Sequence, residues 1–226
     1  ETFFFFRMTD EEYRVLEKIK NSIPVCYLAD HADFALGIVT GNNKKFLSAE
    51  KTENSEMVLK GTDICKYHIN PVKQYLRFEP EQFQQVAPLE IYRAPEKLLY
   101  RFISNQLVVA YDDRQMLSLN SCNIVIPKID GMQIKYILAI LNSSVSQFVY
   151  QKEFHSIKVL RAHMEHIPIP RVGKAIQNEI IAMTEPLICG MGKEAAETCQ
   201  KRLDCRIMDL FRLSAEEQWI IRHALH

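Results

Sequence analysis

The sequence is poor in glycine and carries no surplus of charge of either sign. Only 7 of its 226 residues are glycine, which argues against an enzyme built on glycine-rich phosphate-binding loops. The 28 Lys and Arg residues balance the 28 Asp and Glu residues, so the chain is not a basic tail that coats nucleic acid. With 47% hydrophobic and 25% charged residues, its composition is that of a folded globular chain.

Long apolar segments and paired cysteines are also missing. No run approaches the roughly 20 consecutive apolar residues that cross a bilayer, so we expect no membrane partner. The aromatic residues at positions 3–6 are followed at once by charged residues, which favours a buried strand over a signal sequence. The six cysteines form no C-x-x-C pair, and we interpret them as small buried side chains in a reducing cytoplasm.

Common catalytic motifs are absent as well. The sequence contains no G-x-G-x-x-G, G-x-x-x-x-G-K-[ST], G-x-S-x-G or H-E-x-x-H pattern. His163 and His166 have no third metal ligand nearby in the sequence, and we interpret them as surface or phosphate-facing histidines. A hydrolase that uses Ser121 or Cys122 with His155 is the least favoured hypothesis, because nothing in the pattern orders a nucleophile and a base.

The first half of the chain predicts a mixture of short elements. Residues 10–19 have helical apolar spacing, and Thr9 with Glu12 forms a capping-box pattern at their start. Residues 40–43 (TGNN) predict a turn, because glycine and asparagine tolerate a positive φ. Alternating or β-rich runs predict strands at residues 74–78, 98–103, 107–111 and 121–126, the last three as a meander with turns at residues 105–106 and at a solvated Asp112-Asp113 pair.

From residue 134 onward the apolar period becomes helical. We predict one amphipathic helix over residues 134–149 with a weak break at 142–144, and an extended segment at 166–170, where two prolines disfavour helix. Further helices are predicted over 175–188, 193–211 and 214–225, with a break at residues 190–192. The sequence therefore predicts an α+β fold, with a mixed domain at residues 1–172 and a helical tail or spacer at residues 173–226.

The balanced charge is unevenly distributed along the chain. Residues 41–77 and residues 148–177 each carry a net charge of +3, and such local basic segments can bind a polyanion. Asn42, Asn43, Lys44 and Lys45 form one polar loop, and Lys152, His155, Lys158 and Arg161 form a second. Asn reads adenine edges, and Lys or Arg reads guanine edges. For each loop taken alone, a hydrated turn explains the residues equally well.

Several segments, taken in order, carry a family pattern. Residues 37–46 (GIVTGNNKKF) fit G-I-x-T-G-x-N-x-x-F, and residues 60–67 (KGTDICKY) fit (K/R)-G-x-D-I-x-x-Y. Residues 136–143 (YILAILNS) are similar to Y-L-L-A-L-L-N-S, residues 156–170 to K-x-L…I-P-I-P, and residues 210–217 (LFRLSAEE) to L-Y-x-L-T-x-E-E. Together they resemble target recognition domains of fused adenine-specific methyltransferases of the type IIG restriction–modification class, and the fourth segment also resembles type I specificity subunits.

This resemblance implies a curved, mostly antiparallel β-rich recognition domain with flanking helices and a helical C-terminal tail. Its expected partners are double-stranded DNA and a methyltransferase domain of the same parent chain. The glycines and the N-P-P-aromatic motif of that methyltransferase domain are absent here. We therefore expect a domain that recognises DNA without modifying it and holds no cofactor, while S-adenosylmethionine is expected in the parent methyltransferase domain.

The resemblance does not transfer individual base contacts, so the site residues are predicted from charge and residue type. We expect phosphate contacts first, and base-edge or groove contacts second. Both kinds of contact require the two cationic segments to lie on one concave wall that accepts the duplex. The phosphate candidates are Lys44, Lys45, Lys60, Lys158 and Arg161; the base-edge or groove candidates are Asn42, Asn43, Arg101 and Lys152; His155 lies in the same segment.

A protein-interaction module is the alternative hypothesis. In that case the helical tail would dock a partner through an exposed apolar seam. The seam would consist of Ile180, Ile181, Leu187, Leu203, Ile207, Leu210 and Phe211.

Overall fold

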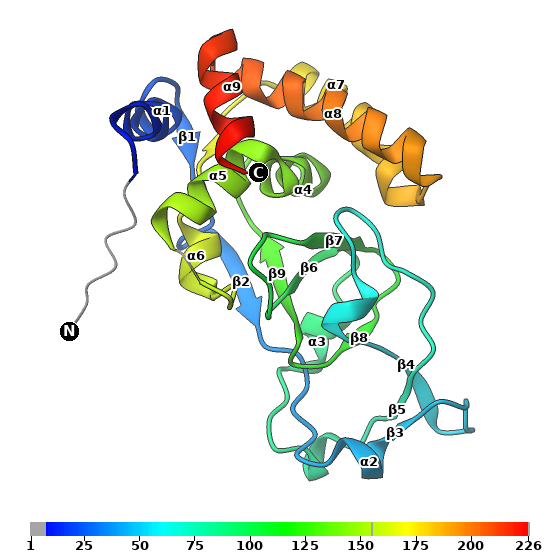
Figure 1. Ribbon diagram of the computed structural model, residues 1–226. Coiled ribbons are helices and arrows are strands. Elements are labelled where there is room, and N and C mark those ends of the chain that lie inside the picture. The colour runs from blue at the N-terminus through cyan, green and yellow to red at the C-terminus, as the bar shows by residue number, and fades with distance from the viewer. Residues whose placement is uncertain (1–7, 155, 226) are drawn as a thin grey trace, which may run out of the picture.

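The computed structural model describes residues 8–154 and 156–225 and has the predicted α+β architecture. Helices cover one face of a central antiparallel sheet, and a smaller sheet lies on the other side (Figure 1). The strand expected at residues 3–6 lies outside the described residues. None of the described helices is long and apolar enough to cross a membrane.

Two four-stranded sheets and one short ladder make up the β structure. The central sheet has the order β2-β9-β6-β7, the smaller sheet has the order β3-β5-β4-β8, and β1 pairs with β10. The strands are β1 (Val25–Cys26), β2 (Ala32–Ala35), β3 (Leu47–Ser48), β4 (Ser55–Leu59), β5 (Tyr75–Arg77), β6 (Lys97–Arg101), β7 (Val109–Asp112), β8 (Leu117–Ser118), β9 (Cys122–Pro127) and β10 (Ile169–Pro170).

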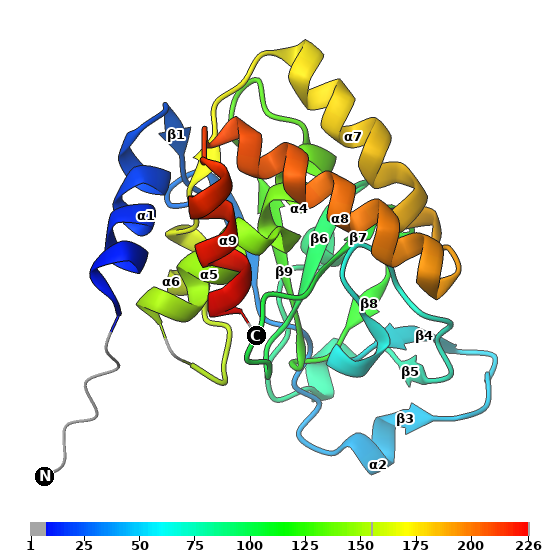
Figure 2. The ribbon, with the colours of Figure 1, turned by 45° about the horizontal axis from the view of Figure 1, so that its top comes forward.

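Most of the helical residues belong to a layer above the central sheet (Figure 2). Short helical turns also occur in the loops of the smaller sheet. The helices are α1 (Asp10–Asn21), α2 (Asn43–Phe46), α3 (Leu89–Tyr92), α4 (Ile134–Asn142), α5 (Ser144–Glu153), α6 (Arg161–Glu165), α7 (Lys174–Cys189), α8 (Lys193–Leu210) and α9 (Ala215–Ala224), with 3₁₀ turns η1 (Gly61–Asp63) and η2 (Pro80–Gln82).

The predicted meander is wrong in its pairing. β6 and β7 form the expected hairpin, but β9 pairs with the other edge of β6. Between them the chain leaves the central sheet as β8, which runs parallel to β4 in the smaller sheet. This excursion connects the two sheets and brings the β8–β9 turn to the side of the molecule that carries the smaller sheet.

The interpretation of Asp112 as a solvated residue is also wrong. Its carboxylate is fully buried and lies 2.5 Å from the buried ammonium group of Lys97. The backbone N–H groups of Arg114 and Met116 also donate to this carboxylate, at 2.9 and 3.0 Å. Buried charges are tolerated where they are paired and hydrogen-bonded, and this network joins the start of β6 to the end of β7.

Side chains along β6 alternate between two hydrophobic cores. Leu98 and Tyr100 belong to the core under the helices, whereas Leu99 belongs to the core shared with the smaller sheet. Successive side chains of a strand point to opposite faces. Arg101 therefore follows Leu99 on the face of the smaller sheet.

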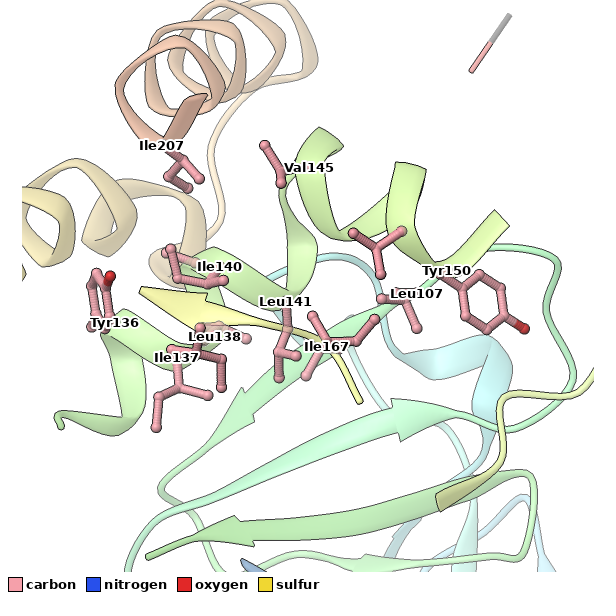
Figure 3. Packing of buried hydrophobic residues seen from close by; sticks show 14 of the residues in the cluster. Leu107, Tyr136, Ile137, Leu138, Ile140, Leu141, Val145, Tyr150, Ile167 and Ile207 are labelled. Atoms are coloured by element: carbon pink, nitrogen blue, oxygen red, sulfur yellow. The ribbon is translucent and has the colours of Figure 1, made fainter. Parts of the chain in front are cut away.

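The amphipathic segment after residue 134 forms two helices, not one. Ser143 has an extended conformation (φ −68°, ψ 159°) and its hydroxyl oxygen accepts a hydrogen bond from the backbone N–H of Ser146. Ser143 thus ends α4 and caps α5. The α4 residues Ile137, Leu138 and Leu141 pack in the main core, as Figure 3 shows.

The helices at the C-terminus share this core. Ile180, Leu187, Leu203, Ile207 and Phe211 are buried in it. Ile181 and Leu210 are partly buried against the same core. The alternative hypothesis, in which the helical tail docks a partner through an exposed apolar seam, is therefore wrong. The boundary at residue 172 stays a prediction, and helices from both sides of it pack together.

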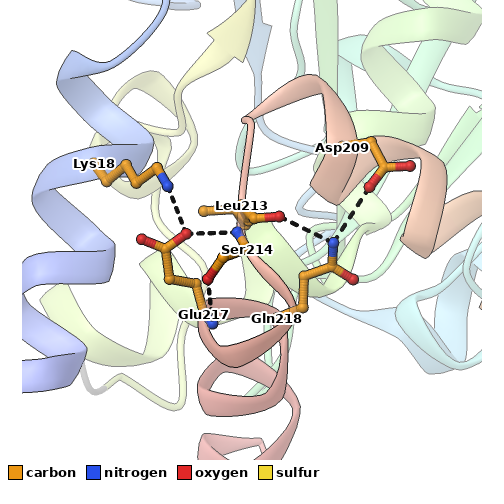
Figure 4. Close-up of polar contacts among 6 residues, drawn as sticks. All are labelled: Lys18, Asp209, Leu213, Ser214, Glu217 and Gln218. Carbon is orange, nitrogen blue, oxygen red and sulfur yellow. Dashed lines mark hydrogen bonds and ion pairs between the residues drawn. The ribbon is translucent and has the colours of Figure 1, made fainter.

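The α8–α9 turn attaches α9 to α1. The hydroxyl oxygen of Ser214 accepts from the backbone N–H of Glu217, and the Glu217 carboxylate accepts from the backbone N–H of Ser214. The same carboxylate lies 2.6 Å from the ammonium group of Lys18 on α1 (Figure 4). Partial burial favours a higher pKa for Glu217, but the hydrogen bonds from Lys18 and Ser214 outweigh it, and the pKa lies below its usual value.

Candidate nucleic-acid interface

The predicted turn at residues 40–43 positions the first cationic loop. Gly41 has φ +73°, a conformation that glycine adopts without strain. The side-chain oxygen of Asn42 accepts from the backbone N–H of Lys45 and so caps α2. The side-chain oxygen of Asn43 accepts from the hydroxyl of Thr40 at 2.6 Å. Both amide oxygens therefore order the loop, and Lys44 is exposed on it.

Three of the predicted residues line one polar pocket. This pocket, which we call the polar pocket, has a volume of about 430 Å³ and lies between α2, the loop before η1 and the β8–β9 turn. Sequence reasoning placed Asn43, Lys44 and Lys60 in the site but missed the others, because Gln74 and the β8–β9 turn carry no charge. The further lining residues are Gln74, Asn120 and Ser121, with Leu47 and Leu119.

Two glycines allow the segments around the polar pocket to approach closely. A Cβ atom on Gly61 would lie 2.5 Å from the carbonyl oxygen of Ser121, and one on Gly37 would lie 2.1 Å from the carbonyl oxygen of Leu119. Neither separation is possible for a real side chain. The backbone N–H of Gly61 donates to the Ser121 hydroxyl at 3.0 Å. The pocket wall thus depends on these two positions lacking a side chain.

Arg101 supports the loop that carries Lys60. Its Nε donates to the carbonyl oxygen of Gly61 at 2.8 Å, and a terminal nitrogen donates to the carbonyl oxygen of Ile64 at 2.6 Å. The guanidinium group is half-buried and its donors are directed at the backbone. This geometry favours a positioning role for Arg101 over the base contact that we predicted.

The second cationic segment forms a short antiparallel ribbon with the end of β6. The backbone N–H of Val159 donates to the carbonyl of Phe102 at 2.8 Å, and that of Ser104 donates to the carbonyl of Ile157 at 3.0 Å. The N–H of Phe102 donates to the carbonyl of Ser121 in turn, at 3.0 Å. We call residues 102–104 and 157–159 the ribbon. Ser121 therefore connects the ribbon directly to the polar pocket.

The two cationic segments are therefore linked through Ser121. In both views α6 lies at the left of the molecule and α2 at the bottom (Figures 1 and 2). We call the polar pocket and the ribbon together the cationic face. The convergence of the Gly41 turn and the Lys158 segment on one concave wall stays a prediction.

Three lysines of this face are available for an anionic partner. Within the described part of the chain, no carboxylate lies within 4 Å of the ammonium groups of Lys44, Lys60 or Lys158. The Lys158 ammonium lies 6.0 Å from the centre of the Phe102 ring. Lys45 is directed elsewhere, since its ammonium group donates to the side chain of Gln82 at 2.6 Å.

Two further candidates have intramolecular partners. The Lys152 ammonium lies 2.7 Å from the carboxylate of Glu12 on α1, and both side chains are more than four-fifths buried. This pair joins α5 to α1 and gives the Lys152 ammonium an intramolecular partner, and its DNA contact stays a prediction. Arg161 pairs with Glu165 at 2.7 Å but stays 61% exposed. His155 lies outside the described residues.

The catalytic alternatives find no support in the described residues. The Cys122 thiol is fully buried, which raises its pKa and disfavours the nucleophilic thiolate. His163 is nearly buried and stacks on Phe154 with ring centres 4.5 Å apart, and its Nδ1 accepts from the backbone N–H of Leu160. Burial lowers its pKa, so the phosphate-facing interpretation of His163 is wrong. No cluster of three metal-ligating side chains occurs among the residues described.

A family comparison covers the centre of this arrangement. The model of the TaqI-like C-terminal specificity domain family matches residues 56–169. The matched range contains Lys60, Gln74, the β8–β9 turn and the ribbon, whereas α2 precedes it. A comparison with curated protein sequences finds no match.

One solved structure shares this fold at low sequence identity, and two more are similar with lower TM-scores. The type IIL restriction-modification enzyme MmeI, solved in complex with DNA, superposes with a TM-score of 0.51 at 10% identity, over 87% of this chain and 35% of MmeI. The HsdS subunit from Thermoanaerobacter tengcongensis superposes with a TM-score of 0.46 at 16% identity, over 95% of this chain and 50% of the subunit. The type IIG restriction endonuclease BpuSI superposes with a TM-score of 0.48 at 11% identity, over 90% of this chain and 33% of BpuSI. The chain thus spans half or less of each of these proteins.

Proposed function

The chain belongs to the TaqI-like C-terminal specificity domain family, and we propose that it recognises a sequence in double-stranded DNA through its cationic face. The observation that carries this proposal is the grouping of Lys44, Lys60 and Lys158 with amide side chains. All three lysines are exposed, and none has a carboxylate partner among the described residues.

The chemistry of the face separates into two tasks. Lysine ammonium groups neutralise phosphates and supply affinity that does not depend on sequence. The side chains of Gln74 and Asn120, which line the polar pocket, can form paired hydrogen bonds with an adenine edge. We therefore propose that the lysines position the duplex and that these two amides contribute to the choice of sequence.

The activity of the parent protein is a proposal that goes further. We propose that this chain is a non-catalytic part of an adenine-specific, S-adenosylmethionine-dependent DNA methyltransferase in the bacterial cytoplasm, with or without endonuclease activity. The motif resemblance supports this class, and so does the fold shared with MmeI, of which the chain spans 35%. A methyltransferase domain of the same parent chain is the proposed intramolecular partner.

A matched charge reversal tests DNA recognition. We expect the triple variant Lys44→Glu, Lys60→Glu and Lys158→Glu to lose most of its affinity for duplex DNA. The slope of the logarithm of the DNA-binding constant against the logarithm of the salt concentration should become shallower by about 0.9 for each phosphate that is no longer neutralised. Fluorescence anisotropy of a labelled duplex across a salt series gives both values.

The control variant reverses three exposed lysines on the α7–α8 hairpin, namely Lys174, Lys193 and Lys201. It has the same net charge as the test variant, so nonspecific repulsion is equal in the two. We expect it to keep the salt slope of the unmodified chain. Equal reductions of affinity in both variants, or no reduction in the test variant, would refute the assignment of the cationic face.

A further inference from the structure

The ribbon carries a large exposed apolar side chain opposite its single lysine, Lys158. Ile103 is 62% exposed, although isoleucine is among the residue types most often buried. Single exposed apolar residues are common on proteins, so a function for Ile103 has to be argued from the residues around it. Its β-branched side chain has few rotamers and loses little freedom on contact.

The ribbon places Ile103 beside a cation. Ile103 and Lys158 are directly opposite each other in the antiparallel pairing, and opposite residues of such a pair share one face. Ile157 is the chain neighbour of Lys158 and is 71% exposed, but the alternation of an extended chain directs it to the other face. The backbone pairing therefore places Ile103 and Lys158 on one face and Ile157 on the other, while the Lys158 ammonium lies 6.0 Å from the centre of the Phe102 ring.

The position of the ribbon relates this pair to the polar pocket. Phe102, which precedes Ile103, donates its backbone N–H to the carbonyl of Ser121, a residue of the pocket. Arg101 reaches the loop of Lys60 through the carbonyl of Gly61. Two hydrogen-bonded links therefore connect the ribbon to the polar pocket and to the loop that carries Lys60.

We propose that Ile103 determines specificity by contacting the C5-methyl group of a thymine in the major groove, while Lys158 contacts an adjacent phosphate. The major groove admits a two-stranded ribbon, and the thymine methyl is the apolar group among the base edges exposed there. The cation beside Ile103 complements the DNA backbone. This inference rests on the proposed function and adds to it an apolar contact that the polar pocket cannot make.

Removing the methyl group from the DNA tests the contact directly. A duplex is selected from a random-sequence library for tight binding to the chain, and it is then prepared once with thymine and once with uracil, which lacks only the C5-methyl. We expect the uracil duplex to bind about fourfold more weakly for each thymine methyl that Ile103 touches. Ile103→Ser should bind the two duplexes equally.

Ile157→Ser is the matched control, because it removes an equally exposed isoleucine from the other face of the same ribbon. We expect it to keep the full difference between thymine and uracil duplexes. Circular dichroism and melting temperatures verify that both variants are folded. The proposal is overturned if the unmodified chain binds the thymine and uracil duplexes equally. It is also overturned if Ile103→Ser keeps the difference in affinity between the two duplexes, or if Ile157→Ser abolishes it.

The outcomes also separate this inference from the function on which it rests. If the unmodified chain binds the selected duplex with the expected salt dependence but ignores the methyl group, only the role of Ile103 is wrong. If the selection enriches no duplex, DNA recognition by the chain and the thymine contact are both wrong.

Discussion

Replacing Gly61 with alanine should weaken the fold and DNA binding together, because this glycine lies where two segments of the polar pocket touch. The new Cβ atom would lie 2.5 Å from the carbonyl oxygen of Ser121 and 3.3 Å from Cγ of Arg101. The nearest atom belongs to the backbone, so no side-chain rotation relieves the clash. The loop that carries Lys60 must therefore move away from the β8–β9 turn.

The size of the effect follows from the interactions that this movement strains. Overpacking of a tight site costs about 1–3 kcal/mol, and breaking the hydrogen bond from the Gly61 N–H to the Ser121 hydroxyl adds about 1 kcal/mol. We expect the free energy of unfolding to fall by about 2–4 kcal/mol. For a chain of this length, the melting temperature should fall by roughly 4–16 °C.

Thermal unfolding followed by circular dichroism measures the stability, and anisotropy of a labelled duplex measures the binding. Gly173→Ala is the control, because a Cβ atom there meets nothing within 4 Å, and we expect a change within about 0.5 kcal/mol. Ser121→Ala isolates the hydrogen bond and should cost about 1 kcal/mol. If Gly61→Ala melts and binds DNA like the unmodified chain, the close approach does not hold the pocket together.

Three further substitutions test other parts of the structure. Lys97→Met leaves the buried carboxylate of Asp112 without its cation and should lower the free energy of unfolding by about 3–5 kcal/mol, measured in urea. Arg101→Lys keeps the charge but cannot hold two carbonyls in the same fork, so DNA affinity should fall in a binding titration while the salt slope stays unchanged. Glu217 has a pKa below its usual value of 4.5, so the stability it contributes is present above that pH and is lost as the pH falls through the lower native value. Glu217→Gln should therefore melt lower than the unmodified chain at neutral pH, and the difference should shrink on acidification; an unchanging difference would contradict the ion pair with Lys18.

Local signals predicted the elements whose boundaries depend on neighbouring residues. The capping boxes of Thr9 with Glu12 and of Ser214 with Glu217 both formed, and α1 and α9 begin where these patterns occur. Gly41 adopts the positive φ that the turn required. In each case the partner atoms lie within four residues of one another, so the sequence contains both sides of the interaction.

Features that depend on distant partners could not be predicted in the same way. Asp112 looked solvated because its cation, Lys97, lies 15 positions away and reaches it only after β6 and β7 pair. Lys152 looked available because its partner, Glu12, is 140 positions away. The net charge of a segment counts lysines with and without an intramolecular carboxylate partner equally. For this reason Lys60 and Lys152 were placed in one predicted site, although only Lys60 lines the polar pocket.

The uncharged part of the site was missed for a related reason. Asn120 and Ser121 resemble an ordinary turn in the sequence, and Gln74 resembles the start of a strand. They join the lysines only because the chain leaves the central sheet through β8 and returns as β9 on the far side of β6. A pairing order that differs from the chain order is set by packing of the two cores, and local patterns do not contain it.

The framework of the cationic face is built from backbone groups together with the side chains of Ser121 and Arg101, which separates part of the stability of the face from its specificity. At Ser121 the N–H of Phe102 donates to the backbone carbonyl, the N–H of Gly61 donates to the side-chain hydroxyl, and the chain approaches closely at Gly37. The side chains that project from this framework, such as Gln74 and Asn120, are not among the bonds that hold it together. A specificity domain must change its DNA contacts without losing its fold, and this framework meets that requirement at Gln74 and Asn120, because it does not use their side chains.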